Sequence, residues 1–171
     1  MQGTPTGTIG EIGGLKTYIA TGGHKELEDD KNVKSVVYFI ADVHGITLNN
    51  NKILADRFAK EIGAKCVLTF FFSFCDMLTL SCDYRVYLPD FFDGEDLTVQ
   101  APTPEARAKF DLGAFIGKYH PREKSWPKVE AALKEIKAKH PSAKVGAVGY
   151  CESAPLKRNL VCFADNFLSV T

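Results

Sequence analysis

The feature of this chain that most constrains its fold is a short apolar run that leads directly into a cysteine flanked by small residues. Residues 145–147 (VGA) are followed by residues 148–153 (VGYCES), which place Gly149 and Ser153 two positions on either side of Cys151. In such a segment the cysteine lies on a sharp strand-to-helix turn, because a larger residue at either flanking position would clash. The thiol then faces the positive end of the following helix, which favours the thiolate. The segment therefore predicts a strand–turn–helix unit with a candidate nucleophile at Cys151.

A second interpretation of Cys151 stays open on the residues alone. A buried cysteine at the end of a strand is commonly a small apolar core residue rather than a reactive thiol. Enzymes with this kind of turn also carry their catalytic acid and histidine later in the chain, whereas no histidine follows Cys151 in this sequence. A nucleophile and a core cysteine are therefore alternatives.

Composition and charge argue against nucleic-acid binding and membrane insertion. Lys and Arg total 21 and Asp and Glu total 21, so the chain lacks the basic excess of an electrostatic nucleic-acid binder. The most apolar stretch, residues 66–75, ends at Asp76, well short of the roughly 20 apolar residues that a membrane span needs. The five cysteines follow no metal-ligand spacing, and the polar N-terminus does not have the pattern of a signal peptide. We expect a soluble cytoplasmic protein with free thiols, and the sequence does not indicate its oligomeric state.

The order of apolar segments predicts an α/β fold with a mostly parallel sheet. A hairpin is expected over residues 7–20, where Gly13 and Gly14 supply the turn. Further strands are expected at 35–41, 85–90 and 143–150, and helices at 49–62, 104–118 and 126–140. Strands that alternate with helices in this way pair in parallel, because each helix carries the chain back across the sheet.

Polar residues follow the ends of three predicted strands. Asp42, Asp90 and Cys151 each come directly after an apolar strand segment, and the carboxyl ends of parallel strands are where such folds hold their active sites. We therefore expect these residues to converge. Asp42 has a second interpretation as the cap of the turn, because Asp is favoured in turns regardless of function. Asp90 and Asp93 most simply form the turn after their strand.

The remaining polar motifs predict no cofactor and no metal ion. No His/Cys cluster has the spacing of a zinc site, and no Gly-rich loop after the first strand fits a dinucleotide or a phosphate. His44 lies close to the expected site, but a loop histidine beside a glycine is more often solvated than catalytic. His24, His120 and His140 lie in loops or beside proline and indicate no chemistry.

Four groups of residues, taken in order, resemble the dienelactone hydrolase family, in particular its fungal-type members. They are residues 3–8 (GTPTGT) with 13–20 (GGLKTYIA), residues 42–45 (DVHG) with 49–50 and 54–59 (LADRFA), residues 88–94 (LPDFFDG), and residues 148–151 (VGYC). The resemblance covers positions 3–65 and 85–151. Each group is weak alone, and the ordered set is fairly specific.

The resemblance implies an α/β-hydrolase fold and a Cys-His-Asp triad that acts on carboxylic esters and lactones. Carried over residue by residue, it makes Cys151 the nucleophile and Asp42 the acid that assists it. The backbone N–H groups of Val43 and Glu152 would form the oxyanion hole, which stabilises the charge that develops on the substrate carbonyl oxygen. The substrate would be a small ester or lactone, with no cofactor, no metal, no nucleic acid and no membrane as partner.

Two departures from the family accompany the resemblance. Residues 66–84 (CVLTFFFSFCDMLTLSCDY) have no counterpart in the family, and their removal would join residues 61–65 directly to the strand at 85–90. We interpret this atypical insert as a translated retained intron. The family continues Trp-Gly-Gly after its nucleophile, whereas this chain reads Glu152-Ser153, and the apolar spacing of the tail over residues 156–167 favours a helix. We therefore expect one domain over residues 1–171, an incomplete α/β-hydrolase core truncated at its C-terminus.

Three functional hypotheses follow. The first is a carboxylic ester or lactone hydrolase of the dienelactone-hydrolase type with a cysteine nucleophile. The second is a catalytically inactive fragment or pseudo-enzyme, because the triad histidine and aspartate have no counterpart after Cys151. The third is a binding module of flavodoxin-like architecture, for which the chain offers no ligand loop.

Overall fold

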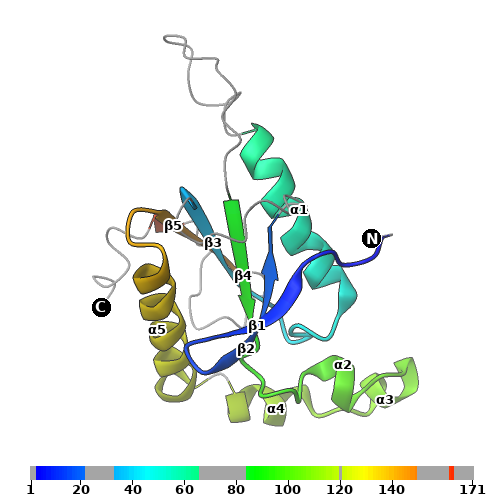
Figure 1. The fold of residues 1–171 in the computed structure, drawn as a ribbon. Coiled ribbons are helices and arrows are strands. Elements are labelled where there is room, and N and C mark those ends of the chain that lie inside the picture. Colours follow the sequence, from blue (N-terminus) through cyan, green and yellow to red (C-terminus); the bar gives the residue numbers. More distant parts are fainter. Residues whose placement is uncertain (1–2, 22–32, 66–83, 120, 150–161, 164–171) are drawn as a thin grey trace.

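The chain folds around a mixed β-sheet with a helix on each face (Figure 1). A computed structural model describes residues 3–21, 33–65, 84–119, 121–149 and 162–163. The strands are β1 (Thr8–Ile12), β2 (Leu15–Ala20), β3 (Ser35–Ile40), β4 (Tyr84–Pro89), β5 (Lys144–Gly149) and β6 (Cys162–Phe163). The helices are α1 (Asn49–Lys65), α2 (Leu97–Gln100), α3 (Pro104–Ala108), α4 (Leu112–Tyr119) and α5 (Arg122–Lys139).

The strand order of the described sheet is β1-β2-β4-β3-β5-β6. The three central strands β4, β3 and β5 are parallel, because α1 and α5 each carry the chain back across the sheet between them. The pairings of β1 with β2, β2 with β4, and β5 with β6 are antiparallel. The α/β class is confirmed. The expectation of a mostly parallel sheet is wrong for the whole sheet, which is mixed, and correct for its centre.

The N-terminal hairpin forms as predicted. Gly13 and Gly14 have φ angles of 61° and 75°, and they connect Ile12 to its partner Leu15. A two-residue turn with two positive φ angles matches the right-handed twist of the strands that it joins. Glycine adopts that backbone without the Cβ clash that other residues suffer.

The core has two layers, one on each face of the sheet. Successive residues of β3 point to opposite faces of the sheet. Tyr38 packs in the layer covered by α5, and Phe39 packs in the layer covered by α1. Both side chains are almost completely buried. This two-sided burial explains why residues 35–41 form a continuous apolar run instead of an alternating one.

Two helices have limits that differ from the predicted ones. α1 continues through Gly63 to Lys65, because an interior glycine costs a helix only about 1 kcal/mol and does not oblige it to end. α5 begins at Arg122, one turn before the predicted start, and contains Pro127. The carbonyl of Pro121 accepts the first N–H groups of α5, so its first turn forms upstream of that proline.

The predicted helix over residues 104–118 is broken in two. α3 is capped by the Thr103 hydroxyl and ends at Ala108, and Asp111 then accepts the Ala114 N–H at 2.8 Å to start α4. Side chains that cap new helix starts compete with continuation of the old helix. The short α2 is absent from the prediction, because four residues are too few to show a helical period.

The remaining expectations concern the tail, the residues around Cys151 and the atypical segment. The helix expected over the tail is contradicted at Cys162–Phe163, which form β6 and pair with β5. The open edge of β5 offers unpaired backbone groups, which a strand satisfies and a helix does not. Cys151, Glu152 and the atypical segment up to residue 83 lie outside the described residues.

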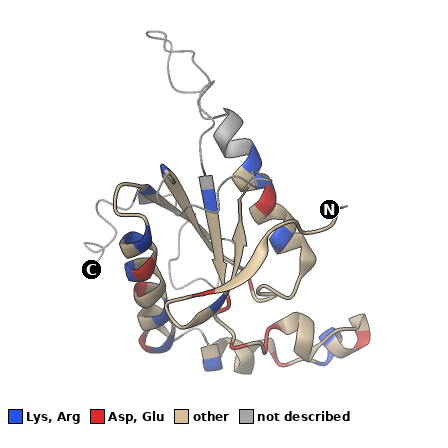
Figure 2. Cartoon of the chain, viewed as in Figure 1, with Lys and Arg blue, Asp and Glu red and all other residues tan. Residues whose placement is uncertain are grey.

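The segment between β4 and α5, residues 90–121, contains α2, α3 and α4 and lies beyond the carboxyl end of β4 (Figure 1). Basic and acidic residues are interspersed over this segment and along α5 rather than gathered by sign (Figure 2). Among the described residues, no helix is long and apolar enough to cross a membrane.

Candidate functional site

The carboxyl ends of the parallel strands lie together at one end of the sheet, which we call its carboxyl edge. Ile40 is the last residue of β3 and pairs with Gly149, the last residue of β5, and the β3–β4 pairing aligns Tyr38 with Tyr87. Asp42 and Asp90 therefore follow adjacent strand ends, as predicted. The chain reaches Cys151 two residues after β5 ends. Cys151 itself lies outside the described residues, so its convergence with Asp42 stays a prediction.

Asp42 organises the turn that follows β3. Its Oδ1 accepts the N–H of His44 and the side-chain amide of Asn51, both at 3.1 Å. The same Asn51 amide donates to the Gly45 carbonyl at 2.8 Å, and the Gly45 N–H donates to the Asp42 carbonyl at 2.9 Å. Within the described part of the chain, Asp42 Oδ2 accepts no hydrogen bond. The interpretation of Asp42 as the cap of this turn is thus confirmed, and its second oxygen is left available.

The backbone of Val43 is bonded on one side only. Its carbonyl accepts the Leu97 N–H at 2.9 Å, while its own N–H donates to no acceptor among the residues that the structure describes. Val43 is half-buried. Buried backbone donors are normally paired, and a donor kept unpaired at a strand end is what an oxyanion hole needs.

His44 is held in place rather than free in solvent. Its Nδ1 lies 3.2 Å from the hydroxyl of Thr98, and that hydroxyl is 3.5 Å from the His44 carbonyl. The imidazole is half-buried. The expectation of a solvated histidine is therefore wrong, because α2 lies directly against this turn.

The buried carboxylate of Asp96 was not singled out in the sequence. It is fully buried and accepts three N–H groups, those of Thr47 at 3.1 Å, Thr98 at 3.0 Å and Val99 at 3.2 Å. The last two bonds cap the start of α2. An Asp directly before Leu-Thr-Val-Gln is a helix-start signal, but the bond to Thr47 spans 49 residues of sequence and leaves no local pattern.

Gly45 and Asp96 are in close contact across the two segments. Gly45 has a φ angle of +56°, and a Cβ built there would lie 2.6 Å from the Asp96 carboxylate. Both the backbone angle and the contact require glycine. The glycine of the DVHG motif thus permits the approach of α2 to the turn.

Asp90 forms the turn after β4, as its simpler interpretation predicted. Its two carboxylate oxygens accept the N–H groups of Phe92 at 3.0 Å and Gly94 at 2.7 Å. Both partners are local, and the residue is 4% exposed. Asp90 therefore shapes its own loop and makes no hydrogen bond to the turn after β3.

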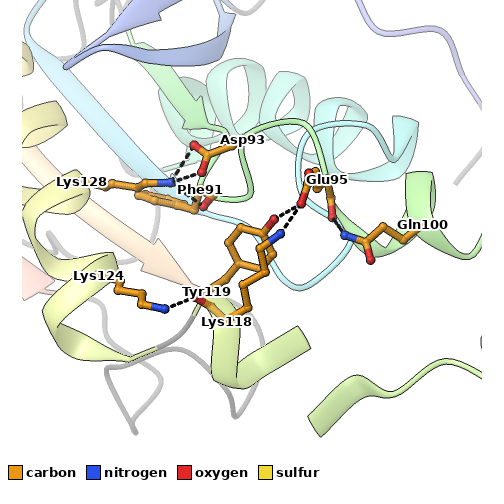
Figure 3. Close-up of polar contacts among 8 residues, drawn as sticks. All are labelled: Phe91, Asp93, Glu95, Gln100, Lys118, Tyr119, Lys124 and Lys128. Carbon is orange, nitrogen blue, oxygen red and sulfur yellow. Dashed lines mark hydrogen bonds and ion pairs between the residues drawn. The ribbon is translucent and has the colours of Figure 1, made fainter. Parts of the chain in front are cut away.

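The loop after β4 is tied to α5 by a lysine (Figure 3). Lys128 donates to the Asp93 carboxylate at 2.7 and 2.8 Å and to the Phe91 carbonyl at 3.1 Å. Asp93 has a φ angle of 54°. Because the Asp93 side chain is mostly exposed, this pair orients the loop more than it stabilises the fold.

The same loop is tied to α4 by Glu95 (Figure 3). Its carboxylate accepts Lys118 Nζ at 2.5 Å and the hydroxyl of Tyr119. The lysine first, and then the tyrosine, lower the pKa of Glu95 below its ordinary value. These contacts set the course of the chain immediately before Asp96.

The other described histidine lies near the amino ends of the parallel strands, at the opposite end of the sheet from Asp42. His140 is buried, and its Nε2 lies 2.6 Å from the Tyr87 hydroxyl. It follows α5 and precedes the amino end of β5, away from Asp42. His24 and His120 lie outside the described residues. Within the described ranges, no three His, Cys, Asp or Glu side chains are grouped to hold a metal ion.

Fold and site together define an α/β protein with a glycine-dependent turn and a spare backbone donor at the carboxyl edge of a mixed sheet. Hydrolase tropI of Talaromyces stipitatus is 28% identical over 157 residues, 88% of this chain and 49% of that protein. Hydrolase pyvD of Aspergillus violaceofuscus is 23% identical, over 88% of this chain and 48% of that protein. Dienlactone hydrolase 1 of Gibberella moniliformis is 30% identical, over 90% of this chain and 49% of that protein.

These similarities confirm the resemblance to the dienelactone hydrolase-like family that the motifs indicate. The chain spans about half the length of the curated relatives that it matches. No family model matches it, and no solved structure does.

Proposed function

We propose that this chain is a dienelactone-hydrolase-like hydrolase of carboxylic esters or lactones, with Cys151 as its nucleophile. The observation that supports this most directly is the turn after β3. It presents an unpaired Val43 N–H and the open Oδ2 of Asp42 at the edge where β5 leads toward Cys151. The hydrolase names of the relatives point to the same chemistry.

The first chemical step is acylation of the cysteine. The Cys151 thiolate attacks the substrate carbonyl carbon, forming a C–S bond, and the C–O bond to the alcohol leaving group then breaks. The Val43 and Glu152 N–H groups stabilise the charge on the carbonyl oxygen. Asp42 assists by accepting the thiol proton through Oδ2 and returning it to the oxygen of the leaving alcohol, while Oδ1 stays bonded to the turn. Hydrolysis of the resulting thioester by water completes the reaction.

The competing proposal is a chain that is inactive in turnover. It is favoured by the engagement of the described histidines: His44 Nδ1 is bonded to Thr98, and His140 is bonded to Tyr87 at the other edge. The two proposals differ after acylation, because clearance of the thioester requires a base that activates water, which gives up its proton far less readily than a thiol does.

The test is reaction of the purified chain with 4-nitrophenyl acetate. We expect release of 4-nitrophenolate together with an acetyl group on Cys151, located by peptide mass spectrometry. Release of more than one equivalent per chain supports the hydrolase, and release that stops at one equivalent supports the chain inactive in turnover. Cys151→Ala should abolish the reaction, whereas Cys162→Ala removes a thiol elsewhere and serves as the matched control. Equal release of 4-nitrophenolate by Cys151→Ala and by the unaltered chain would contradict the proposal of a cysteine hydrolase.

The role of Asp42 is tested in the same assay. Asp42→Asn keeps an oxygen that can accept from the His44 N–H, so the turn is retained, but it removes the carboxylate base. We expect acylation of Cys151 to slow by roughly tenfold to a hundredfold, as for loss of a proton acceptor. Asn51→Ala removes the amide that donates to Asp42 Oδ1 while the carboxylate stays, and it should slow acylation less. An unchanged acylation rate in Asp42→Asn would show that Asp42 only forms the turn and does not act as a base.

A further inference from the structure

The peptide group between Val43 and His44 is held from both sides. Its carbonyl accepts the Leu97 N–H at 2.9 Å, and its N–H donates to Asp42 Oδ1 at 3.1 Å. A peptide fixed at both polar atoms cannot rotate without breaking a hydrogen bond. The preceding peptide carries the Val43 N–H, and its carbonyl, that of Asp42, accepts the Gly45 N–H at 2.9 Å, while Gly45 lies against the Asp96 side chain. The orientation of the candidate oxyanion donor is therefore determined partly from α2.

Asp96 connects α2 to the strand-end turn, residues 42–47. Its Oδ1 caps α2 through the N–H groups of Thr98 and Val99, and its Oδ2 accepts the Thr47 N–H at the other end of the turn. Capping of a short helix requires the first oxygen only. The second oxygen, together with the contact of the Asp96 side chain against Gly45, binds the turn itself.

We propose that Asp96 is a positioning residue for the oxyanion donor, a role that rests on the proposed cysteine hydrolase. Asp96 bonds the far end of the strand-end turn and places the Leu97 N–H on the Val43 carbonyl. The Val43 N–H is thereby kept directed away from internal acceptors and ready for a substrate oxygen. Asp96 touches no reacting atom. Its loss weakens stabilisation of the oxyanion and leaves the reactivity of the thiol intact.

Two reactions of Cys151 separate these effects. Acylation by 4-nitrophenyl acetate passes through an oxyanion on the carbonyl oxygen. Alkylation by iodoacetamide displaces iodide from a saturated carbon, forms a C–S bond and develops no oxyanion. The ratio of the acylation rate to the alkylation rate, both measured at Cys151 by peptide mass spectrometry, therefore reports the oxyanion donors. General loss of structure changes both rates.

The first variant is Asp96→Asn, with Asp90→Asn as its matched control. An asparagine keeps an oxygen that caps α2, but it turns an NH₂ group toward the Thr47 N–H and breaks that bond. We expect the ratio to fall at least about tenfold, within the loss seen when an oxyanion donor is removed. Asp90 is also buried and bonded to two backbone N–H groups, yet it makes no hydrogen bond to the strand-end turn. Its variant should change the ratio by less than about twofold.

The second variant, Leu97→Pro, removes one N–H group with little change to the helix. Leu97 is the first residue of α2, where proline is favoured, and Asp96 has the extended backbone that a following proline requires. The bond to the Val43 carbonyl is lost, so the ratio should fall as in Asp96→Asn. Circular dichroism checks the fold of each variant. If Asp96→Asn does not fold, the ratio measured for Leu97→Pro tests the positioning role.

The outcomes distinguish this proposal from the one on which it rests. If the unaltered chain shows no Cys151-dependent acylation, the cysteine hydrolase and the positioning role both fail. If acylation occurs but neither variant lowers the ratio, only the positioning role of Asp96 is overturned. The same holds if Asp90→Asn lowers the ratio as much as Asp96→Asn.

Discussion

Asp42 and Asp90 lie at neighbouring strand ends, where carboxylates bind backbone N–H groups and fix irregular chain. Asp96 does the same at the start of α2. The first two were predictable, since an acidic residue directly after an apolar run marks a strand end. Asp96 was not, because its bond to Thr47 joins residues that are remote in sequence. The proposed nucleophile and its Glu152 partner stay predictions.

A buried hydroxyl provides a residue-scale prediction. Tyr18 donates to the Asp56 carboxylate at 2.8 Å and accepts the Gly7 N–H at 2.6 Å. Its burial, and then the bond to Asp56, raise the pKa of the phenol well above its ordinary value. Tyr18→Phe leaves a carboxylate and an N–H group short of a partner, so we expect the free energy of unfolding to fall by about 1–3 kcal/mol in urea titration.

The matched control for this prediction is Tyr119→Phe. Its hydroxyl also donates to a carboxylate, that of Glu95, but at an exposed position where water replaces the lost bond. We expect a much smaller change in the free energy of unfolding. Equal losses in the two variants would contradict the structural importance of the Tyr18 contact.

At the scale of elements, strands were better predicted than helices. The hairpin, β3, β4 and β5 follow from apolar runs bounded by turn residues. Helix limits depend on capping bonds instead, such as the Ala114 N–H on Asp111 that starts α4. Several neighbouring polar residues could cap a helix start equally well, and the sequence does not indicate which of them does.

The contact of the hairpin with α5 provides an element-scale prediction. A Cβ at Gly13 would lie 2.4 Å from the Ala132 backbone nitrogen in α5, whereas at Gly14 it would meet nothing within 4 Å. Both residues have positive φ angles, so alanine costs each about 1–2 kcal/mol in backbone strain. Gly13→Ala adds a clash in the core, and we expect it to cost about 2–5 kcal/mol in total.

Chemical denaturation of both variants measures the difference. Gly13 also donates its N–H to Glu135 at 2.5 Å, a bond that lowers the pKa of that carboxyl and holds the same turn on α5. Displacement of the turn would break this bond too. If Gly13→Ala is no less stable than Gly14→Ala, the hairpin does not pack on α5 as closely as described.

At the scale of the whole molecule, the central strands and their crossovers follow from the order of elements, but the edges of the sheet do not. Antiparallel addition of β2 to β4 and of β6 to β5 depends on which open edge each segment meets. Local periodicity does not specify that choice.

The two elements that flank the atypical segment, α1 and β4, both pack against described residues of the core. Ala55 and Ala59 of α1 pack with Val86 and Leu88 of β4 in the same core layer, and β4 pairs with strands on both sides. Removal of residues 66–84 would join Lys65 to Arg85, with the last turn of α1 unwinding to supply a connection of ordinary length. We therefore expect a deletion of residues 66–84 to fold cooperatively.

Thermal unfolding and size-exclusion chromatography measure this expectation. Shortening a loop stabilises a fold only slowly, by about 0.6 kcal/mol for each halving of its length, so the melting temperature should stay close to that of the full chain or rise by a few degrees. The aggregated fraction should fall, because residues 68–74 are apolar, uncharged and free of proline. A variant with a Gly/Ser linker of the same length separates composition from length. If the linker variant folds and the deletion does not, the connection needs its length. If neither folds, the segment itself contributes to the fold, and its interpretation as a retained intron is contradicted.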